Sequence, residues 1–174
     1  MPGSAPTSLP ALAEISHCFV GLGSNVGDRI GNLRDARSRL NALPGTMVTA
    51  QSPIYQTPPW GKTDQDPFAN AVLALQTALA PMALLDACLK IELDMGRMRR
   101  ERWGPRVIDI DLLIYDDVQL DSERLRLPHP AMAERAFVLV PLLDLVPDLV
   151  LNGTSGRAML AELDTKGIER IGEI

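Results

Sequence analysis

The chain has few of the residues on which several common functions depend. Its 174 residues include two cysteines, two histidines and only 4% aromatic side chains. Cys18 and Cys88 have no metal-binding spacing and lie in apolar segments, so we expect two buried thiols and a reducing, cytoplasmic setting. The histidines, His17 and His129, complete no Ser-His-Asp or Cys-His arrangement, which leaves nucleophilic catalysis unsupported.

Positive charge and long hydrophobic runs are also scarce. The net charge of −5 provides no basic field for general nucleic-acid binding. Residues 1–16 lack the basic and apolar regions of a signal peptide, and prolines and aspartates interrupt the apolar segment 136–151, so we expect no membrane span. Pro, Ser, Gly and Ala content indicates a disordered N-terminal extension over residues 1–14 and one domain over residues 15–174.

Hydrophobic periodicity predicts alternating strands and helices. The expected elements in chain order are a strand over 17–22, a helix over 28–43, a β-rich segment over 46–56, a strand over 68–77, a helix over 81–95 and a strand over 107–115. Pro53 indicates an edge position or a bulge. This β-α-β-β-α-β order predicts an α+β fold, with a ferredoxin-like antiparallel sheet in a three-layer α/β/α arrangement. Helices over 137–145 and 157–163 would follow at the C-terminal end.

Two carboxylates stand two residues apart in an aliphatic run, at Asp109 and Asp111. Residues i and i+2 of a strand share a face, so both carboxylates would lie on one side of the sheet, with Ile108, Ile110 and Leu112 on the other. Two adjacent carboxylates repel each other and need positive charge nearby. The charge could be Mg²⁺, which pairs protein carboxylates with phosphate oxygens, or arginines in a structural ion-pair network.

Arginines gather immediately before this pair. They are Arg97, Arg99, Arg100, Arg102 and Arg106. In an acidic protein such a cluster suits a small polyanion, because a guanidinium is permanently charged and can hold phosphate oxygens with two donors. A solvated basic loop is the alternative.

The glycine-rich segment 21–27 follows a predicted strand, but it does not match a nucleotide-binding fingerprint. Val26 occupies the third glycine position of G-x-G-x-x-G, and no acidic residue ends the next strand. A tight turn in the first strand-to-helix connection fits the segment better. The chain also has no G-x-x-x-x-G-K-[ST] sequence, which excludes a P-loop kinase.

A second constellation combines Phe68, Asn70 and the loop at residues 58–61. Asn offers donors and an acceptor to the edge of a heterocycle, and Phe can stack on a flat ring, although Phe at a strand start is more often a core residue. His129 lies between two prolines, where a hydrogen-bonded surface histidine is more common than a catalytic one.

Residues 102–113 carry the most specific motif, a basic residue and a spacer before Gly-Pro-Arg, followed by Asp-aliphatic-Asp and two aliphatic residues. Supporting matches are Gly-Ser-Asn at 23–25, Ser-Pro-Ile-Tyr-Gln-Thr-Pro-Pro-Trp-Gly at 52–61, Phe-Ala-Asn-Ala at 68–71, Leu-Pro-His at 127–129 and Arg-Ala-Phe at 135–137. Together they resemble the hydroxymethyl-dihydropterin pyrophosphokinases of folate biosynthesis.

The resemblance implies Mg²⁺-dependent transfer of the pyrophosphoryl group of ATP to the hydroxymethyl group of 6-hydroxymethyl-7,8-dihydropterin, with release of AMP. It implies that Asp109 and Asp111 hold two Mg²⁺ ions, and that Arg97 and Arg106 act with them as catalytic residues by stabilising charge on the phosphates. No general base is assigned, since phosphoryl transfer depends more on positioning and charge neutralisation than on covalent catalysis.

The resemblance also assigns substrate contacts. The expected ATP-binding residues are Glu92, Arg97, Trp103, Arg106, Leu112, Arg124, His129 and Arg135. The expected pterin-binding residues are Thr57, Pro58, Pro59, Trp60, Gly61, Phe68, Asn70 and Phe137. The pterin would stack between the two phenylalanines. The expected partners are these small molecules, and the expected state is a cytoplasmic monomer with scope for a weak contact with the next folate-pathway enzyme.

Two other functions stay open from the residues alone. One is a ligand-sensing regulatory module of the same fold, in which the Asp pair is salt-bridged. The other is a different Mg²⁺-dependent nucleotide enzyme, such as a cyclase-like phosphotransferase. The chain also departs from the family pattern: Trp60 stands where many members have Leu, and Pro130 replaces a frequent Tyr.

Overall fold

The structure, a computed structural model, describes residues 14–96 and 104–174. Its elements are β1 (Ser16–Ser24), α1 (Arg29–Asn41), β2 (Thr46–Gln51), β3 (Pro53–Thr57), β4 (Phe68–Thr77), α2 (Pro81–Asp94), β5 (Asp109–Tyr115), β6 (Leu120–Asp121), β7 (Arg126–Leu127), the 3₁₀ helix η1 (Met132–Glu134), α3 (Ala136–Leu145), β8 (Val150–Leu151), β9 (Thr154–Ser155), α4 (Gly156–Ala161) and β10 (Glu169–Glu173). The predicted extension, apart from Glu14, lies outside the described residues, and so do Arg97 and Trp103.

An antiparallel sheet forms the centre of the molecule. Its strand order is β10-β3-β4-β1-β5, and β2 pairs with β4 beyond β3. The predicted β-rich segment 46–56 is therefore two strands, β2 and β3, which Ser52 separates. The Ser52 hydroxyl accepts a hydrogen bond from the Val72 backbone N–H at 2.9 Å, which fixes the interruption against β4. This finding confirms the predicted α+β class with an antiparallel sheet.

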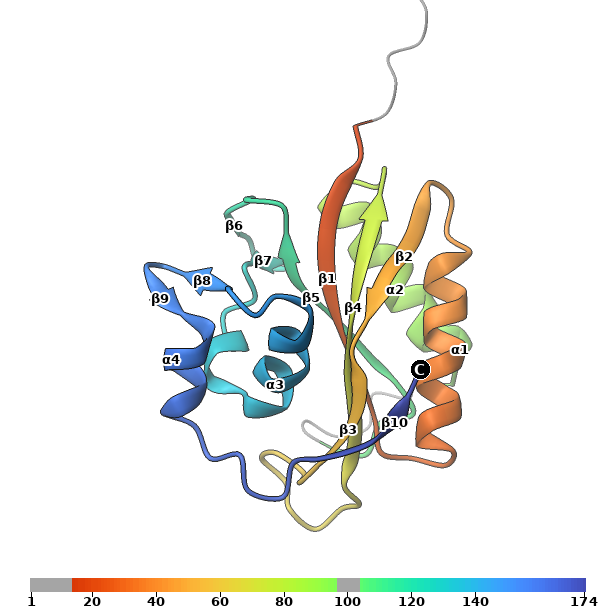
Figure 1. Cartoon of the computed structure of the whole chain (residues 1–174). Helices are drawn as coiled ribbons and strands as arrows, with labels where there is room; N and C mark the ends of the chain where they lie inside the picture. Colours follow the sequence, from red (N-terminus) through yellow and green to blue (C-terminus); the bar gives the residue numbers. More distant parts are fainter. Residues whose placement is uncertain (1–13, 97–103) are drawn as a thin grey trace, which may run out of the picture.

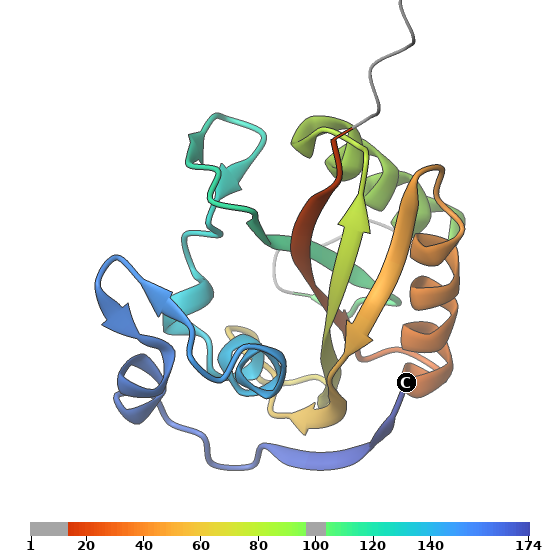
Figure 2. The ribbon, with the colours of Figure 1, turned by 45° about the horizontal axis from the view of Figure 1, so that its top comes forward.

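Helices cover both faces of the sheet. Figure 1 shows α1 and α2 on one side of it and α3 and α4 on the other, and Figure 2 shows the same separation from a second direction. Leu33 of α1 and Leu84 of α2 belong to one buried core, which includes both predicted thiols, Cys18 and Cys88. Leu139 of α3 belongs to a second core, on the other face.

Local sequence explains where the helices begin and end. The Asp28 carboxylate accepts the Gly31 backbone N–H at 2.9 Å and caps α1, and Gly45, with a φ of 62°, follows its end. Pro81 occupies the first turn of α2, where its missing N–H has no cost. Among the described residues, none of the helices has the length and apolarity to cross a bilayer.

The structure also corrects two expectations and adds a strand. Gly21 and Gly23 lie inside β1 and pair with strands on both sides, so they are not part of a turn. Pro53 does not mark a sheet edge, because β10 pairs with β3 on its outer side. The strand β10 itself was not predicted, since its sequence, Glu-Arg-Ile-Gly-Glu, has three charged residues and little apolar patterning.

Candidate active site

A cavity of about 290 Å³ lies on the α3 side of the sheet. Its lining comes from β1, β3, β4, β5, the loop after β3 and the segment from His129 to α3. The lining residues are Gly21, Leu22, Gly23, Thr57, Pro58, Trp60, Phe68, Asn70, Ala71, Val72, Gly104, Arg106, Asp109, Asp111, His129, Arg135, Phe137 and Val138. The cavity thus brings together both aspartates, six of the eight predicted pterin-binding residues and three of the eight predicted ATP-binding residues.

Two glycines of β1 form the floor of the cavity. Gly21 pairs with Asp111 of β5, and Gly23 pairs with Asp109 of β5 and with Asn70 of β4. Because glycine has no side chain, the sheet surface is hollow between the carboxylates and Asn70. A Cβ atom at Gly23 would lie 2.8 Å from Asn70 Oδ1, so the floor tolerates no side chain there.

One side of the cavity, here called the aromatic wall, consists of Thr57, Pro58, Phe68, Asn70 and Phe137. Asn70 is only 7% exposed, and its Nδ2 donates a hydrogen bond to Thr57 Oγ1 at 2.6 Å. That bond fixes the orientation of the amide and leaves its oxygen on the side of Gly23. A rigid amide among aromatic rings suits the polar edge of a flat heterocycle.

The charged and basic residues of the lining, here called the charged wall, are Arg106, Asp109, Asp111, His129 and Arg135. The two aspartates occupy one face of β5, while Ile110 and Leu112 enter the core on the other face, as the spacing predicted. Carboxylates and cationic side chains at one cavity suit a metal-bound polyphosphate.

Asn25 holds the backbone of Arg106 in place. The Asn25 backbone N–H donates to the Arg106 carbonyl at 3.0 Å, and Asn25 Oδ1 accepts the Arg106 backbone N–H at 2.7 Å. The Asn25 amide nitrogen donates to Gln65 Oε1 and to the Asp66 carbonyl in the loop before β4. This buried side chain therefore fixes the approach to β5 against that loop.

His129 and Arg135 are coupled electrostatically. Partial burial, assisted by the positive charge of Arg135, lowers the pKa of His129 below its usual value of 6.5. Nδ1 of His129 accepts the Ala131 backbone N–H at 3.2 Å, so the proton of the neutral ring resides on Nε2, which can donate to a ligand. The Arg135 guanidinium lies 5.0 Å from the centre of the Trp60 ring and 5.8 Å from that of Phe137, within the range of cation–π attraction.

Five of the predicted contacts do not line the cavity. Leu112 faces the opposite core, Glu92 is 2% exposed and accepts the Ile110 backbone N–H at 2.8 Å, and Arg124 forms an ion pair with Asp86 at 2.5 Å. Pro59 and Gly61 lie in the loop beside Trp60 without lining the cavity. Their roles in binding stay predictions, as do those of Arg97 and Trp103.

The prediction missed several lining residues, of which Gly21, Gly23, Ala71, Val72 and Val138 are examples. Small residues at alternating positions of a strand were the available signal for the glycines. The other three lie beside predicted residues in sequence, and only the packing of α3 over β4 shows that they contribute to the cavity.

The donor set fits Mg²⁺. Across residues 14–96 and 104–174, no group of three or more His, Cys, Asp and Glu side chains has the arrangement of a metal site. Asp109 and Asp111 nevertheless provide hard oxygen ligands on one face, and Mg²⁺ commonly uses one or two protein carboxylates together with phosphate oxygens and water. Residues of the charged wall could therefore hold Mg²⁺ when a polyphosphate is present.

Comparison with known proteins identifies the family. The model of the 7,8-dihydro-6-hydroxymethylpterin-pyrophosphokinase (HPPK) family matches residues 19–147. The chain belongs to the HPPK family. The match spans all residues of both walls, and it confirms the family resemblance and the enzyme class that the motif at residues 102–113 indicated.

Relatives of high identity cover nearly the whole chain. The chain is 54% identical over 157 residues to a 2-amino-4-hydroxy-6-hydroxymethyldihydropteridine pyrophosphokinase of Methylorubrum extorquens, covering 90% of this chain and 99% of that protein. It is 46% identical over 158 residues to a protein of the same name from Pseudomonas aeruginosa, covering 90% of this chain and 98% of that protein.

The fold also matches solved HPPK structures. A crystal structure of Plasmodium falciparum HPPK-DHPS A437G with STZ-DHP superposes with a TM-score of 0.68 at 15% identity, over 88% of this chain. Our chain spans 46% of the length of that chain. At this identity the likeness establishes the fold alone.

Proposed function

We propose that this HPPK-family chain transfers pyrophosphate from ATP to the hydroxymethyl group of 6-hydroxymethyl-7,8-dihydropterin, giving AMP and the pterin diphosphate for tetrahydrofolate synthesis. One observation carries the proposal: a single cavity brings a carboxylate pair and cationic side chains together with an aromatic wall that has a fixed amide. A relative that is 54% identical is named for this activity. Both substrates would meet between the two walls.

On the aromatic wall, the pterin would stack on Phe68 and Phe137, with its polar edge at Asn70. The Asn70 amide is held by Thr57, so it would bind without reorganising. Trp60, Pro58 and the adjoining loop would close the outer side. This placement would direct the hydroxymethyl group toward the carboxylates of β5.

On the charged wall, Asp109 and Asp111 would hold two Mg²⁺ ions against the triphosphate. Bound Mg²⁺ neutralises phosphate charge and aligns the reacting oxygens. Arg106 and Arg135, with Arg97 from outside the described residues, would stabilise the negative charge on the transferring group. Nε2–H of His129 would donate to a phosphate oxygen. The neutral state of this ring at pH 7, which follows from its lowered pKa, fits a donor better than an ion-pair partner.

The reaction would need positioning more than covalent catalysis. The pterin hydroxyl oxygen forms a bond to the β-phosphorus as the bond from that phosphorus to the α-phosphate bridging oxygen breaks, and AMP leaves with that oxygen. The hydroxyl proton is released to solvent or phosphate. We assign no side chain as general base. Glu92, Leu112 and Arg124 are proposed to support the nucleotide from outside the cavity lining, Trp103 to contact the nucleotide, and Pro59 and Gly61 to shape the pterin-binding loop.

Several wider expectations accompany this function. The strand order, with helices on both faces, supports a ferredoxin-like three-layer arrangement within one domain over residues 15–174. We propose a cytoplasmic monomer that binds neither nucleic acid nor membrane. We also propose a weak contact between this protein and the next enzyme of the folate pathway. The support for it is that the structural neighbours are named HPPK-DHPS.

The test is product identity. The protein is incubated with ATP, Mg²⁺ and 6-hydroxymethyl-7,8-dihydropterin, and nucleotides are separated by chromatography. We expect AMP, and we expect Asp109→Ala or Asp111→Ala to lower its rate by about 10³-fold or more, the scale of losing a principal charge-stabilising group. Removal of Mg²⁺ with EDTA should abolish the reaction.

Asp117→Ala is the matched control, because Asp117 is an exposed aspartate in the turn directly after the same strand. It should keep the wild-type rate. Formation of ADP would instead support the different nucleotide enzyme, and pterin or nucleotide binding without turnover would support the ligand-sensing module.

A further inference from the structure

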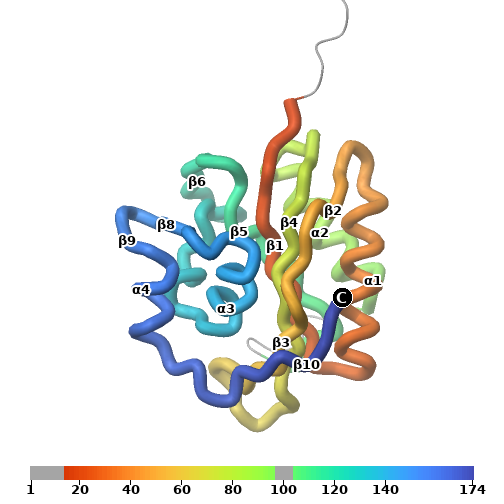
Figure 3. Tube along the Cα trace, viewed as in Figure 1, coloured from red at the N-terminus to blue at the C-terminus, as the bar shows by residue number. Residues whose placement is uncertain are grey.

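The aromatic wall is supported from outside by a segment far away in sequence. β10 pairs antiparallel with β3, with Glu169 opposite Gln56 and Arg170 opposite Tyr55. Because the strands run in opposite directions, the residues before Glu169 continue alongside the residues after Gln56, which are Thr57 and Pro58 of the aromatic wall. The tube in Figure 3 shows this segment running from α4 past β3 to the C-terminus.

Gly167 makes the closest approach to that wall. A Cβ atom at this position would lie 2.9 Å from Pro58 Cγ and 3.6 Å from Pro58 Cδ. Contacts below 3.0 Å require one side to move, and a proline ring has no flexible end that could turn away. Because Gly167 has no side chain, the Pro58 ring can occupy its observed position in the cavity lining.

The turn that carries Gly167 is constrained locally. The Asp164 carboxylate accepts the Lys166 backbone N–H at 2.9 Å, and the Thr165 carbonyl accepts the Ile168 backbone N–H at 3.2 Å. Gly167 itself has a φ of 80°, which glycine adopts readily. The turn is thus fixed by hydrogen bonds on both sides of Gly167.

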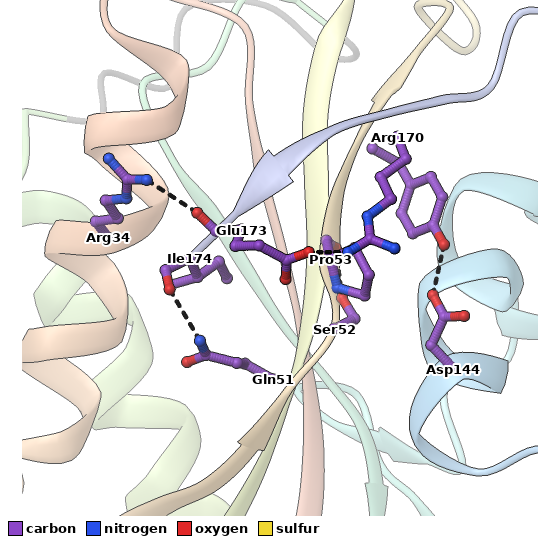
Figure 4. A network of polar contacts seen from close by, with 9 residues as sticks. Arg34, Gln51, Ser52, Pro53, Asp144, Arg170, Glu173 and Ile174 are labelled. Carbon is purple, nitrogen blue, oxygen red and sulfur yellow. Dashed lines mark hydrogen bonds and ion pairs between the residues drawn. The ribbon is translucent and has the colours of Figure 1, made fainter.

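β10 is also anchored at its far end. Arg34 of α1 donates to the Glu173 carbonyl at 3.0 Å, and Gln51 donates to the Ile174 carbonyl at 2.8 Å (Figure 4). Ile171 and Ile174 pack against the core under α1 and α2. β10 is therefore anchored by hydrogen bonds and by packing, whereas Pro58 begins an exposed loop.

We propose that Gly167 is a positioning residue for pterin binding: β10 presents its bare backbone to Pro58 and so fixes the outer boundary of the aromatic wall. This inference rests on the proposed function, because it assumes that the pterin binds at that wall. A side chain at Gly167 would push Pro58 toward the cavity and narrow the pterin site, while the charged wall would keep its shape.

Gly153 provides a matched control for this proposal. Its φ of 79° nearly equals that of Gly167, but a Cβ atom there would meet nothing within 4 Å. Alanine at either position therefore incurs the same backbone strain, and only Gly167→Ala adds the contact with Pro58. The positive φ should lower Tm by roughly 2–12 °C in either variant, and the contact with Pro58 adds to that loss in Gly167→Ala.

The experiment measures pterin and ATP constants for wild type, Gly167→Ala and Gly153→Ala. We expect Gly167→Ala to raise the pterin KM, and the pterin Kd from fluorescence titration without ATP, by about three- to tenfold, with the ATP KM unchanged. Gly153→Ala should keep the wild-type values of all three. Equal pterin constants in the two variants would overturn the proposal, as would equal rises in both ATP and pterin KM for Gly167→Ala.

Gly167→Asn and Gly153→Asn repeat the comparison if the alanine variant folds poorly. Asn tolerates positive φ better than Ala but keeps the Cβ atom, so the same selective loss of pterin affinity is expected at residue 167. Failure of the proposed function would be visible separately, because the wild-type protein would then form no AMP. If wild type forms AMP and the variants at 167 and 153 behave alike, only the present inference fails.

Discussion

Asn70 lies on β4 at the centre of the sheet, whereas Asp109 and Asp111 lie on β5 at its margin. β4 is paired on both sides, with β1 and with β3, and the Asn70 amide is additionally bonded to Thr57. Within the described part of the chain, β5 is paired in this sheet with β1 alone. The aromatic wall is therefore shaped by backbone pairing and steric fit, while the charged wall depends mainly on the charges that its side chains present.

This difference predicts how substitutions act. Added volume should impair the aromatic wall with little effect on nucleotide affinity, because closely packed neighbours such as Asn70 and Pro58 would be displaced from their positions in the pterin site. Changes of charge or of a cation–π contact should act on the charged wall and on ATP. Each of the following experiments tests one side of that comparison.

The largest effect is expected at the cavity floor, from Gly23→Ala. Its Cβ atom would lie 2.8 Å from Asn70 Oδ1 and displace the amide, so the pterin Kd should rise by about 10- to 100-fold. In Gly21→Ala the nearest atom is a Leu113 methyl carbon at 3.6 Å, an ordinary contact, and a rise of less than about threefold is expected. Fluorescence titration of the pterin measures both. Similar losses in the two variants would show that cavity volume, and not the Asn70 amide, determines affinity.

A smaller effect is expected from Trp60→Leu, which restores the residue that many family members have. Trp60 is 44% exposed, and its ring lies 5.0 Å from the Arg135 guanidinium. Replacing the ring should therefore remove about 0.5–1 kcal/mol of cation–π attraction between the two side chains. If Arg135 binds ATP from this position, the ATP Kd rises by about two- to fivefold. Calorimetric titration measures it, and Trp60→Phe should give an intermediate value. An unchanged ATP Kd in Trp60→Leu would show that Trp60 does not position Arg135 for ATP binding.

The smallest effect concerns the pH dependence of stability. Because the folded state lowers the pKa of His129, unfolded chains bind more protons below about pH 6.5, and the free energy of unfolding falls as the pH drops below that value. The contribution of neutral His129 to the free energy of unfolding is fully present above pH 6.5. His129→Gln should reduce this loss of stability between pH 7.5 and pH 5.5, as measured by urea unfolding. His17→Gln is the control for loss of a histidine outside the cavity, and an unchanged pH dependence in His129→Gln would contradict the assignment.

Much of the fold could be predicted because its elements have strong local patterns. The expected bounds 68–77 are those of β4, where apolar residues predominate, and Asp28 and Pro81 mark their helices through residues at or next to the first turn. The two-residue spacing of Asp109 and Asp111 placed them on one face for the same reason. These features depend on neighbours in sequence.

What could not be predicted depends on partners distant in the chain. β10 is a strand because β3 offers it an unpaired edge, and its own residues give no such indication. Gly21 and Gly23 resemble turn glycines until β4 and β5 are seen to pair on both sides of them. The ATP contact that the resemblance implies for Leu112 stays a prediction, while the alternation of the strand directs its side chain away from Asp111 and into the opposite core.

The two thiols offer an internal probe of how the layers come apart. Burial raises the pKa of Cys18 on β1 to about 12, with a further contribution from Asp116, and burial raises that of Cys88 on α2 as well. Thiolates are the reactive species, so neither cysteine should react with an alkylating reagent unless its surroundings open. They are the two cysteines of the chain. The ratio of their labelling rates, followed by mass spectrometry in the native protein, would therefore distinguish two kinds of opening. Faster labelling of Cys88 would show that helix α2 detaches while the sheet stays intact, and equal rates would show that helix and sheet open together.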